Sequence, residues 1–495
     1  MTNLKSRTVN AMKWSYLTMF IVALLGLVFA AILSRLLTPE EFGVVAIAFV
    51  LQRFGQFIGD LGVGQALVQK PELSGEDIQA GFTSSVGLGL LATVAAWLLA
   101  PLAGAYYDMP DLPMVFRVYA AAYMLTAMVV ISTSLLRRQL NFRPLLIGEV
   151  VSLIIGHGLF GLGAAYLGFG ALSLAISALV QALVQMIVLY AFTRHSLRLT
   201  FRPESYRALY AFATRVTIIN FLEFVSSSLD TLMLARLYPQ AELGVYKRAY
   251  NTVGIPALAF ATSLTRVLAP SFSSIQSESD RLRRAHHSAL VALLIVMSCV
   301  AGGIFVAAPE VVAVLLGSQF VEAVILVKIF GLLVPFMVAS NLAGVLAEAT
   351  AQLRIKTTIQ AVYLVALALS FWTVYSLGGS VEAIALVMLA AIVVRNMAFE
   401  LMVRSIVGGG RDILKSYGVG MLCGLGTAAL FYAVIVPLRG LGLSVPLLFT
   451  TELLLGGLPL GVAIFLGPPN ELKSLALRAV AAVTDRLRRV TGERS

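Results

Sequence analysis

The chain has 495 residues, of which 59% are hydrophobic and only 12% are charged, and its mean hydropathy is +0.91. Because a soluble domain carries roughly 25% charged residues, this composition excludes a soluble protein and predicts an all-α polytopic membrane protein. The formal net charge of +11 alone would allow a nucleic-acid partner, so the placement of the basic residues along the chain decides what that charge means.

Apolar stretches of about 20 residues, the length that an α-helix needs to cross a bilayer, recur along the whole chain. Polar and proline-containing segments such as TPEE at 38–41, DMPDLP at 108–113 and LGPPN at 466–470 separate them. We therefore predict fourteen membrane spans. They cover residues 12–34, 42–64, 80–102, 114–136, 145–167, 170–193, 208–234, 246–269, 287–308, 322–347, 357–377, 381–403, 414–437 and 444–467.

Lysine and arginine are distributed unevenly between the two sides that these spans define. If the N-terminus is inside, the inside segments hold about 25 basic residues and the outside segments about 5. This ratio predicts that both termini are cytoplasmic and that most of the positive charge is a topology signal, so no nucleic-acid partner is expected. The basic stretch from 473 onward is predicted to lie as a helix on the anionic inner surface.

The connections between the predicted spans are short, none of them longer than roughly 20 residues. We therefore expect neither an attached ATPase nor the large external loop that a membrane enzyme such as a glycan polymerase would need, and no residue is assigned a catalytic role. No His, Cys and carboxylate cluster has metal-ligand spacing, so no metal and no cofactor are expected. Cys299 and Cys423 lie within apolar segments and are predicted to be unpaired helix residues.

One phrase of the sequence occurs twice. Residues 33–44 read LSRLLTPEEFGV and residues 234–245 read LARLYPQAELGV, at an offset of 201 residues. Both copies lie between two apolar stretches, and duplicated membrane halves are typical of transporters whose lobes rock around a shared cavity. The coinciding residues Glu41 and Glu242, with Gly43 and Gly244, are predicted to shape this turn and cap the next helix, because an acidic residue at a helix start favours the helix dipole. Pro256 and Pro335 interrupt later spans and are predicted flex points, although ordinary tolerated kinks are the alternative.

The repeated phrase, DLGVGQALVQ at 60–69 and LLRRQLNFR at 135–143 together resemble the polysaccharide exporters of the multidrug/oligosaccharidyl-lipid/polysaccharide (MOP) flippase superfamily. Within it, the chain is most similar to Wzx-type and colanic-acid-exporter-like lipopolysaccharide biosynthesis proteins. The resemblance implies two pseudo-symmetric six-helix lobes around a central cavity, followed by a C-terminal helix pair. On this chain those parts would be an N-lobe at 1–200, a C-lobe at 201–410, a helix pair at 411–470 and a basic cytoplasmic tail at 471–495.

The same resemblance implies an activity and its partners. An undecaprenyl-diphosphate-linked oligosaccharide, such as an O-antigen or exopolysaccharide repeat unit, would move from the inner to the outer leaflet of the bacterial inner membrane by alternating access. The partners would be this lipid-linked oligosaccharide, membrane lipids and a polysaccharide polymerase complex. The alternative is a cation-coupled multidrug exporter of the same superfamily, which would favour an acidic, aromatic cavity.

Cationic residues within the predicted spans are the candidates for binding such an anionic cargo. Charges inside a bilayer are costly and usually face a wet cavity or a partner, and arginine can bind phosphate oxygens bidentately. Arg53 is the strongest candidate, because it lies near the middle of its span with Gln52, Gln56 and Asp60 on a polar face beside it; a structural Arg53–Asp60 pair is the alternative. The candidate substrate-binding residues are Arg53, Arg215, Arg266, Lys328 and Arg395.

Some of these cations lie toward the ends of their spans. Arg215 and Arg266 are close to the cytoplasmic ends, so snorkelling to the surface is the alternative for both. Arg117 begins its span at the outer face and is expected to be an interfacial anchor rather than a cavity residue.

The seventh predicted span carries a polar stripe. Arg215, Glu223, Ser226 and Asp230 fall within roughly 80° of arc at about 100° per residue, which favours a cavity lining. A buried carboxylate exchanges protons readily, so Asp60, Glu223 and Asp230 are candidate sites of proton or sodium coupling. The alternative for Asp230 is a salt bridge to an arginine of a neighbouring helix.

His157 is the single histidine of a glycine-rich run, GHGLFGLG at 156–163. A lone histidine in such a run is more often a packing residue that donates a hydrogen bond between helices than a proton relay. We therefore expect His157 to pack, with the relay as the alternative.

Overall fold

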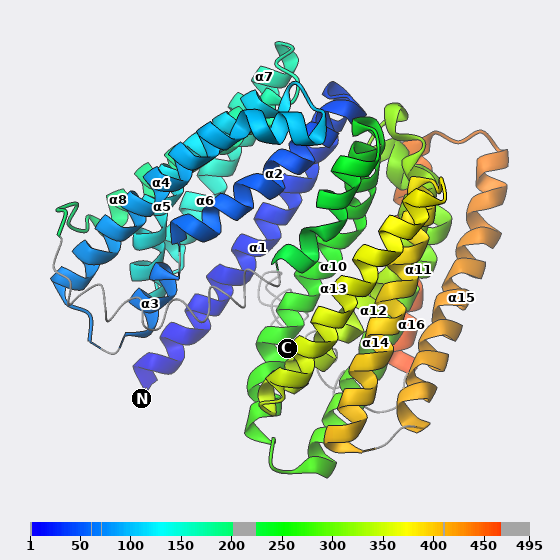
Figure 1. Ribbon diagram of the computed structural model, residues 1–495. Helices are drawn as coiled ribbons and strands as arrows, with labels where there is room; N and C mark the ends of the chain where they lie inside the picture. The colour runs from blue at the N-terminus through cyan, green and yellow to red at the C-terminus, as the bar shows by residue number, and fades with distance from the viewer. Residues whose placement is uncertain (1, 61, 71, 201–223, 409–410, 467–495) are drawn as a thin grey trace, which may run out of the picture. The chain divides into compact units, whose positions relative to one another are not determined.

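Every element of the described chain is helical (Figure 1). The computed structural model describes residues 2–60, 62–70, 72–200, 224–408 and 411–466. Ten of its helices are long and apolar enough to cross a membrane, so the chain is a multi-pass membrane protein. These ten are Leu17–Leu36, Gly75–Tyr107, Leu112–Arg138, Arg143–Tyr166, Leu172–Thr193, Ser279–Leu315, Ala323–Ala349, Leu353–Ser376, Val381–Val407 and Ile413–Gly440.

The other four predicted spans are not among these ten helices. Those at 42–64, 246–269 and 444–467 coincide with helices α2 (Pro39–Asp60), α10 (Gln240–Ser274) and α16 (Val445–Leu466). The span predicted at 208–234 falls largely outside the described residues, which resume with a helix over 224–237.

The chain divides into two compact units. The N-terminal unit comprises Met1–Arg248 and Leu315–Phe320, and the C-terminal unit comprises Ala249–Val314 and Val321–Ser495. Helix α10 begins in the first unit and continues in the second. Besides α2, the helix over 224–237 and the start of α10, the N-terminal unit contains α1 (Thr2–Leu36), α3 (Val63–Gln69), α4 (Gly75–Tyr107), α5 (Leu112–Arg138), α6 (Arg143–Leu153), η1 (Ile154–Gly161), α7 (Leu162–Tyr166), α8 (Leu172–Thr193) and η2 (Ser318–Phe320).

Helix α5 is the centre of the N-terminal unit, where it packs against α2, α4 and α8. Tyr123 of α5 is fully buried, and its hydroxyl donates to the Leu51 carbonyl of α2 at 3.3 Å. Small residues let the neighbouring helices approach: a β-carbon at Gly89 of α4 would lie 3.0 Å from the Ala127 side chain. Helices in a membrane pack through the close approach of their backbones at small residues, because the hydrophobic effect does not drive helices together in lipid.

The span predicted at 145–167 consists of three segments, because a π-helix interrupts it. The π-helix η1 holds His157, whose ring stacks on Phe29 of α1 at a centroid distance of 6.5 Å. On the other side, a β-carbon at Gly156 would lie 2.9 Å from the Ser177 carbonyl oxygen of α8. The glycines therefore allow the widened π-turn to fit between α1 and α8, and His157 lies at a packing contact.

The C-terminal unit is built around α12 (Ala323–Ala349), the most buried of its candidate spans. Its other helices are the remainder of α10, α11 (Ser279–Leu315), α13 (Leu353–Ser376), α14 (Val381–Val407), α15 (Arg411–Gly440) and α16. Helix α12 packs mainly against α14, and α13 packs against α14 in turn. Helix α15 docks on α11 through glycines: a β-carbon at Gly302 would lie 2.2 Å from the Gly424 carbonyl oxygen, so only glycine fits there.

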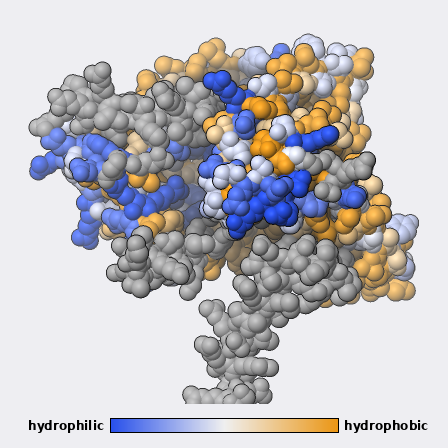
Figure 2. Space-filling view, turned by 90° about the horizontal axis from the view of Figure 1, so that it is seen from below, coloured by the Kyte–Doolittle hydropathy of each residue, from blue (hydrophilic) through white to orange (hydrophobic). Residues whose placement is uncertain are grey.

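Within each unit the loops predicted to be cytoplasmic gather at one end of the helices (Figure 1). In the view toward this end, hydrophilic residues form broad patches at the left and in the centre, and apolar residues lie mainly along the top and right (Figure 2). The exposed basic residues beside these loops include Arg137, Arg143, Arg194 and Arg198 in the N-terminal unit and Arg281, Arg284, Arg354, Arg404 and Lys415 in the C-terminal unit.

Candidate functional site

The repeated phrase forms a reciprocal helix contact within the N-terminal unit. A β-carbon at Gly43 of α2 would lie 2.0 Å from the carbonyl oxygen of Gln240, and one at Gly244 of α10 would lie 1.8 Å from the carbonyl oxygen of Pro39. Pro39 and Gln240 are equivalent positions of the repeat, as are Gly43 and Gly244. The first turns of α2 and α10 therefore meet about a local two-fold axis. Their backbones are so close that only glycine fits at positions 43 and 244.

The start of α2 is held by a capping box. The Thr38 backbone N–H donates to Glu41 Oε2 at 2.8 Å, and the Glu41 N–H donates to Thr38 Oγ1 at 3.3 Å. Two backbone donors at the helix start are satisfied in this way, and the carboxylate lies at the positive end of the helix dipole. Glu242, its equivalent in the repeat, lies half-buried in the first turn of α10.

Two residues that the sequence did not single out fasten the end of α1 to this crossing. Arg248 donates to the Ala30 carbonyl at 2.8 Å, also contacts Ser34 Oγ, and lies over the Phe42 ring at 4.5 Å. Gln319 donates to the Leu37 carbonyl at 2.7 Å. Only tertiary contact reveals these roles, because the carbonyl groups at a helix end carry no side-chain signature in the sequence.

Arg53 is an exposed residue of α2. The guanidinium is 5.7 Å from the ring centroid of Phe224, and Phe224 also packs against Phe54 at 5.2 Å. An aromatic face attracts a cation without neutralising its charge, so Arg53 stays available to an anion. The side chain of Asp60 lies outside the described residues, as do Arg215 and Glu223 of the polar stripe.

Asp230 is 3% exposed and has two bonding partners. Its Oδ2 accepts from Lys247 Nζ at 3.2 Å, and its Oδ1 accepts from the Thr231 N–H at 2.7 Å. The pair joins the helix over 224–237 to α10. A salt bridge across neighbouring helices was the alternative predicted for Asp230, although the cation is a lysine rather than an arginine.

Two further candidate cations lie in the C-terminal unit, and each faces an aromatic ring. Lys328 of α12 is 5.5 Å from the Phe305 ring, and Arg395 of α14 is 4.6 Å from the Tyr363 ring. Within the described part of the chain, neither these two nor Arg53 forms an ion pair. The fifth candidate, Arg266, belongs to α10, but its side chain lies outside the described residues.

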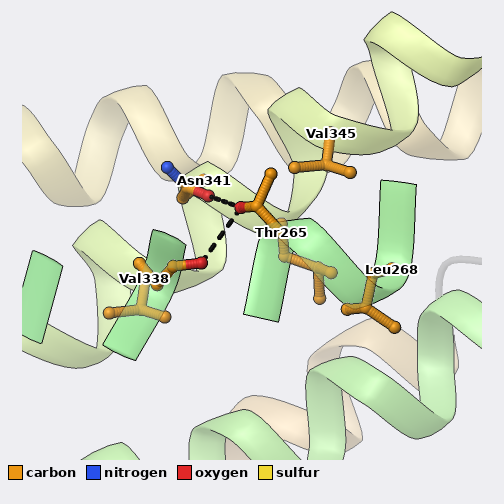
Figure 3. A pocket seen from close by; sticks show the side chains of 7 residues that line it. Thr265, Leu268, Val338, Asn341 and Val345 are labelled. Atoms are coloured by element: carbon orange, nitrogen blue, oxygen red, sulfur yellow. Dashed lines mark hydrogen bonds between the residues drawn. The ribbon is translucent and has the colours of Figure 1, made fainter. Parts of the chain in front are cut away.

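A small hollow lies between α10 and α12 (Figure 3). Thr265 donates to Asn341 Oδ1 of α12 at 2.9 Å. These two residues line the hollow together with Ala261, Leu268, Val338, Leu342 and Val345. Asn341 is exposed, so this face of the C-terminal unit offers polar groups among apolar side chains. Both α10 and α12 continue as helices through their prolines, which include Pro256 and Pro335.

A buried polar chain in the C-terminal unit was not anticipated. The Tyr417 hydroxyl of α15 donates to Glu400 Oε1 of α14 at 3.0 Å and accepts from Asn396 Nδ2. Asn396 Oδ1 in turn accepts from Ser340 of α12 at 3.2 Å. The chain links three helices by hydrogen bonds. Asn396 and Glu400 are four residues apart on α14, but Ser340 and Tyr417 come from other helices, so a local pattern does not reveal the whole chain. Among the described residues no group of three His, Cys, Asp or Glu could hold a metal ion.

Comparison with known proteins identifies the family. The model of a polysaccharide biosynthesis protein family matches residues 32–325, which is more than half of the chain. The chain belongs to this polysaccharide biosynthesis protein family. The match contains both copies of the repeat, so the crossing of α2 and α10 lies within the segment that defines the family.

Two relatives have names that refer to the biosynthesis of a lipopolysaccharide and of succinoglycan. The chain is 23% identical over 443 residues to the lipopolysaccharide biosynthesis protein WzxC of Escherichia coli K12, covering 88% of this chain and 89% of WzxC. It is 26% identical over 321 residues to the succinoglycan biosynthesis transport protein ExoT of Rhizobium meliloti 1021, covering 65% of each.

Two solved structures with the same fold are a flippase and a multidrug resistance transporter. The lipid II flippase MurJ in an inward closed conformation matches with a TM-score of 0.72 at 14% identity, over 95% of this chain and all of MurJ. An inward-facing multidrug resistance MATE family transporter of the MOP superfamily matches with a TM-score of 0.60 at 13% identity, over 80% of this chain and 98% of that one. At these identities the likeness establishes the fold alone.

Proposed function

We propose that this protein is a flippase that moves an undecaprenyl-diphosphate-linked oligosaccharide, an O-antigen or exopolysaccharide repeat unit, from the inner to the outer leaflet of the bacterial inner membrane. The family membership and the names of WzxC and ExoT support a role in exporting a polysaccharide precursor. We further propose fourteen spans, cytoplasmic termini, and two lobes at 1–200 and 201–410 with a helix pair at 411–470.

The observation that carries the proposal is that three cations of the predicted spans lack an acidic partner among the described residues. Arg53, Lys328 and Arg395 face aromatic rings, and none has an ion-pair partner among the described residues. A cation in a membrane is costly unless it has a partner or faces water, so its retention favours an anionic ligand. The diphosphate of a polyprenyl-linked sugar is such a ligand, and arginine can bind its oxygens bidentately. Arg215 and Arg266 are proposed to belong to the same cationic cavity.

The second candidate is a cation-coupled multidrug exporter, which the likeness to the MATE structure keeps open. Such a cargo is itself cationic and would favour carboxylates in the cavity. Asp230 is already paired with Lys247, which leaves Asp60 and Glu223 as the proposed coupling residues for either cargo. The three span cations without an acidic partner favour the anionic cargo.

Reconstituted vesicles test the proposal. The purified protein is incorporated into vesicles with a fluorescent undecaprenyl-diphosphate oligosaccharide, and the rate at which label reaches the far leaflet is measured. We expect Arg53→Gln to lower this rate by at least tenfold, the effect of about 1.4 kcal/mol of lost interaction, and Arg53→Lys to retain part of it.

The matched control is Arg117→Gln, which removes another membrane cation that faces a ring, in this case Trp97 at 5.9 Å. Its transport rate should stay within twofold of the wild type. Transport of cationic dyes without transport of any lipid-linked glycan would overturn the proposal, and equal losses in the Arg53 and Arg117 variants would remove Arg53 from the binding site.

A further inference from the structure

Three charged side chains of the C-terminal unit meet at one end of helices α11, α15 and α16. Glu310 lies near the end of α11, Arg439 is the last residue but one of α15, and Glu452 lies about two turns into α16. The hairpin between α15 and α16 brings the last two together. None of the three is among the site residues predicted from the sequence, and their sequence positions alone do not suggest that they are neighbours.

Arg439 and Glu310 form a bidentate ion pair. Arg439 Nε donates to Glu310 Oε1 at 2.7 Å, and Arg439 Nη2 donates to Glu310 Oε2 at 2.6 Å. The same Nη2 also donates to the Val306 carbonyl oxygen at 2.8 Å. This planar, forked geometry is the strongest form of an arginine–carboxylate contact, and it uses both oxygens of Glu310.

Glu452 is the unmatched member of the group. Its side chain is 3% exposed, and neither of its carboxyl oxygens has a hydrogen-bond partner among the described residues. The charges that act on it are those of Glu310 from α11 and Arg439 from α15. The same three helices also form an apolar cluster that includes Val306, Phe431 and Leu455.

The charges of this group do not balance as they stand. Two carboxylates and one guanidinium leave one negative charge on two buried glutamates, Glu310 at 5% and Glu452 at 3% exposure, and a buried charge without a partner is among the most costly features of a protein interior. One added proton cancels this charge and also supplies the missing hydrogen bond, because a protonated carboxyl gains an O–H donor. We propose that Glu310 and Glu452 form a proton-binding site in which one proton is shared between the two carboxyl groups and Arg439 is the counter-charge.

The oxygen count favours a proton over a metal cation. A hard metal ion needs a shell of several oxygens. Both oxygens of Glu310 already accept from Arg439, which leaves the two oxygens of Glu452 as the free acceptors of the group. A proton needs only one of them.

Infrared spectroscopy of the full-length protein in lipid nanodiscs at neutral pH tests the site, because the carbonyl band of a protonated carboxyl is absent from an ionised one. We expect Glu452→Gln to lose the intensity of one protonated carboxyl. Glu310→Gln should lose the same band, because the remaining Glu452 would then be paired one-to-one with Arg439 and ionised. Arg439→Gln should gain intensity, because two carboxyls would then lack a counter-charge. Exposed Glu322, varied as Glu322→Gln, is the control and should change nothing.

The pattern across the variants separates a shared proton from other arrangements. A band that persists in Glu310→Gln would mean that the proton does not belong to the pair, and a wild type without the band would remove the site. The spectrum is also recorded with choline in place of sodium. A band that grows when sodium is withdrawn would assign the site to sodium and overturn the proton. Thermal unfolding of each variant in the same nanodiscs establishes that the spectra come from folded protein.

Discussion

Gly43 and Gly244, which hold the same place in the two copies of the repeat, each lie against the backbone of the helix that carries the other. The contact is reciprocal: Gly43 faces Gln240, and Gly244 faces Pro39. A duplicated sequence can produce such a contact only where the two copies meet on a local two-fold axis. The repeat is therefore a structural element as well as a trace of duplication, and it lies where three segments, the end of α1 and the starts of α2 and α10, are bonded together.

Substitution of either glycine by alanine should destabilise this crossing. The added β-carbon would lie about 2 Å from a backbone oxygen, so the helices must separate, at a cost of about 1–3 kcal/mol. Because both substitutions open the same contact, the double variant should cost less than the sum of the single variants. Thermal unfolding in detergent measures the effect. Gly26→Ala is the control, since nothing lies within 4 Å of a β-carbon there, and an equal loss of stability in that variant would contradict the role of the crossing.

Hydropathy was sufficient to predict the helical membrane class, because about 20 consecutive apolar residues match the length of a helix that crosses a bilayer and rarely occur in a soluble domain. It could not predict the π-helix around His157, since a π-turn and an α-turn bury the same apolar residues and differ only in how neighbouring helices pack. The sequence also predicted which cations lie within spans. It could not indicate that rings such as Phe224 and Tyr363 face them, because these contacts join segments far apart in the chain.

The sequence also could not predict that Glu310 and Glu452 lie close together. The local sequence does not indicate a site at Glu310 or Glu452, since each is a single acidic residue near the end of an apolar segment. Their meaning depends on Arg439, more than a hundred residues from Glu310, and on burial. A site whose members lie on three helices carries no local periodicity, so only the packing of the helices reveals it.

The docking of α15 on α11 can be tested through the two cysteines. Cys299 Sγ lies 3.8 Å from the Cys423 carbonyl oxygen, and Cys299 is buried between the two helices. Gly302→Val would direct its side chain at the Gly424 carbonyl and should separate the helices. In a Cys423→Ser background, a membrane-permeable maleimide should then label Cys299 several-fold faster. Gly426→Val is the control, because nothing lies within 4 Å of a β-carbon at Gly426, and labelling should stay at the starting rate.

His195 predicts a dependence of stability on pH. Burial lowers the pKa of His195 below its ordinary value, and its hydrogen bond to the Ser196 carbonyl opposes this only in part. The unfolded chain therefore binds a proton at a higher pH than the folded one, so stability is fully present above the ordinary pKa of about 6.5 and is lost as pH falls through the lower, folded value. Thermal unfolding between pH 7 and pH 5 should show this loss, and His195→Phe, which suits the neighbouring rings of Phe82 and Tyr190, should reduce it. An unchanged slope in the variant would assign the pH dependence to other groups.

The pair of Asp230 and Lys247 separates a structural role from ion coupling. Lys247→Gln would leave the Asp230 carboxylate, 3% exposed, without its ion-pair partner and should destabilise the protein by about 3 kcal/mol. The double variant with Asp230→Asn should recover most of that loss, because it removes both charges together. Unfolding in a denaturing detergent measures the stabilities, and vesicle transport is measured on the same preparations. If the pair is structural, the double variant transports at close to the wild-type rate and responds to proton and sodium gradients as before. A double variant that is stable but has lost its response to a gradient would instead assign ion coupling to Asp230.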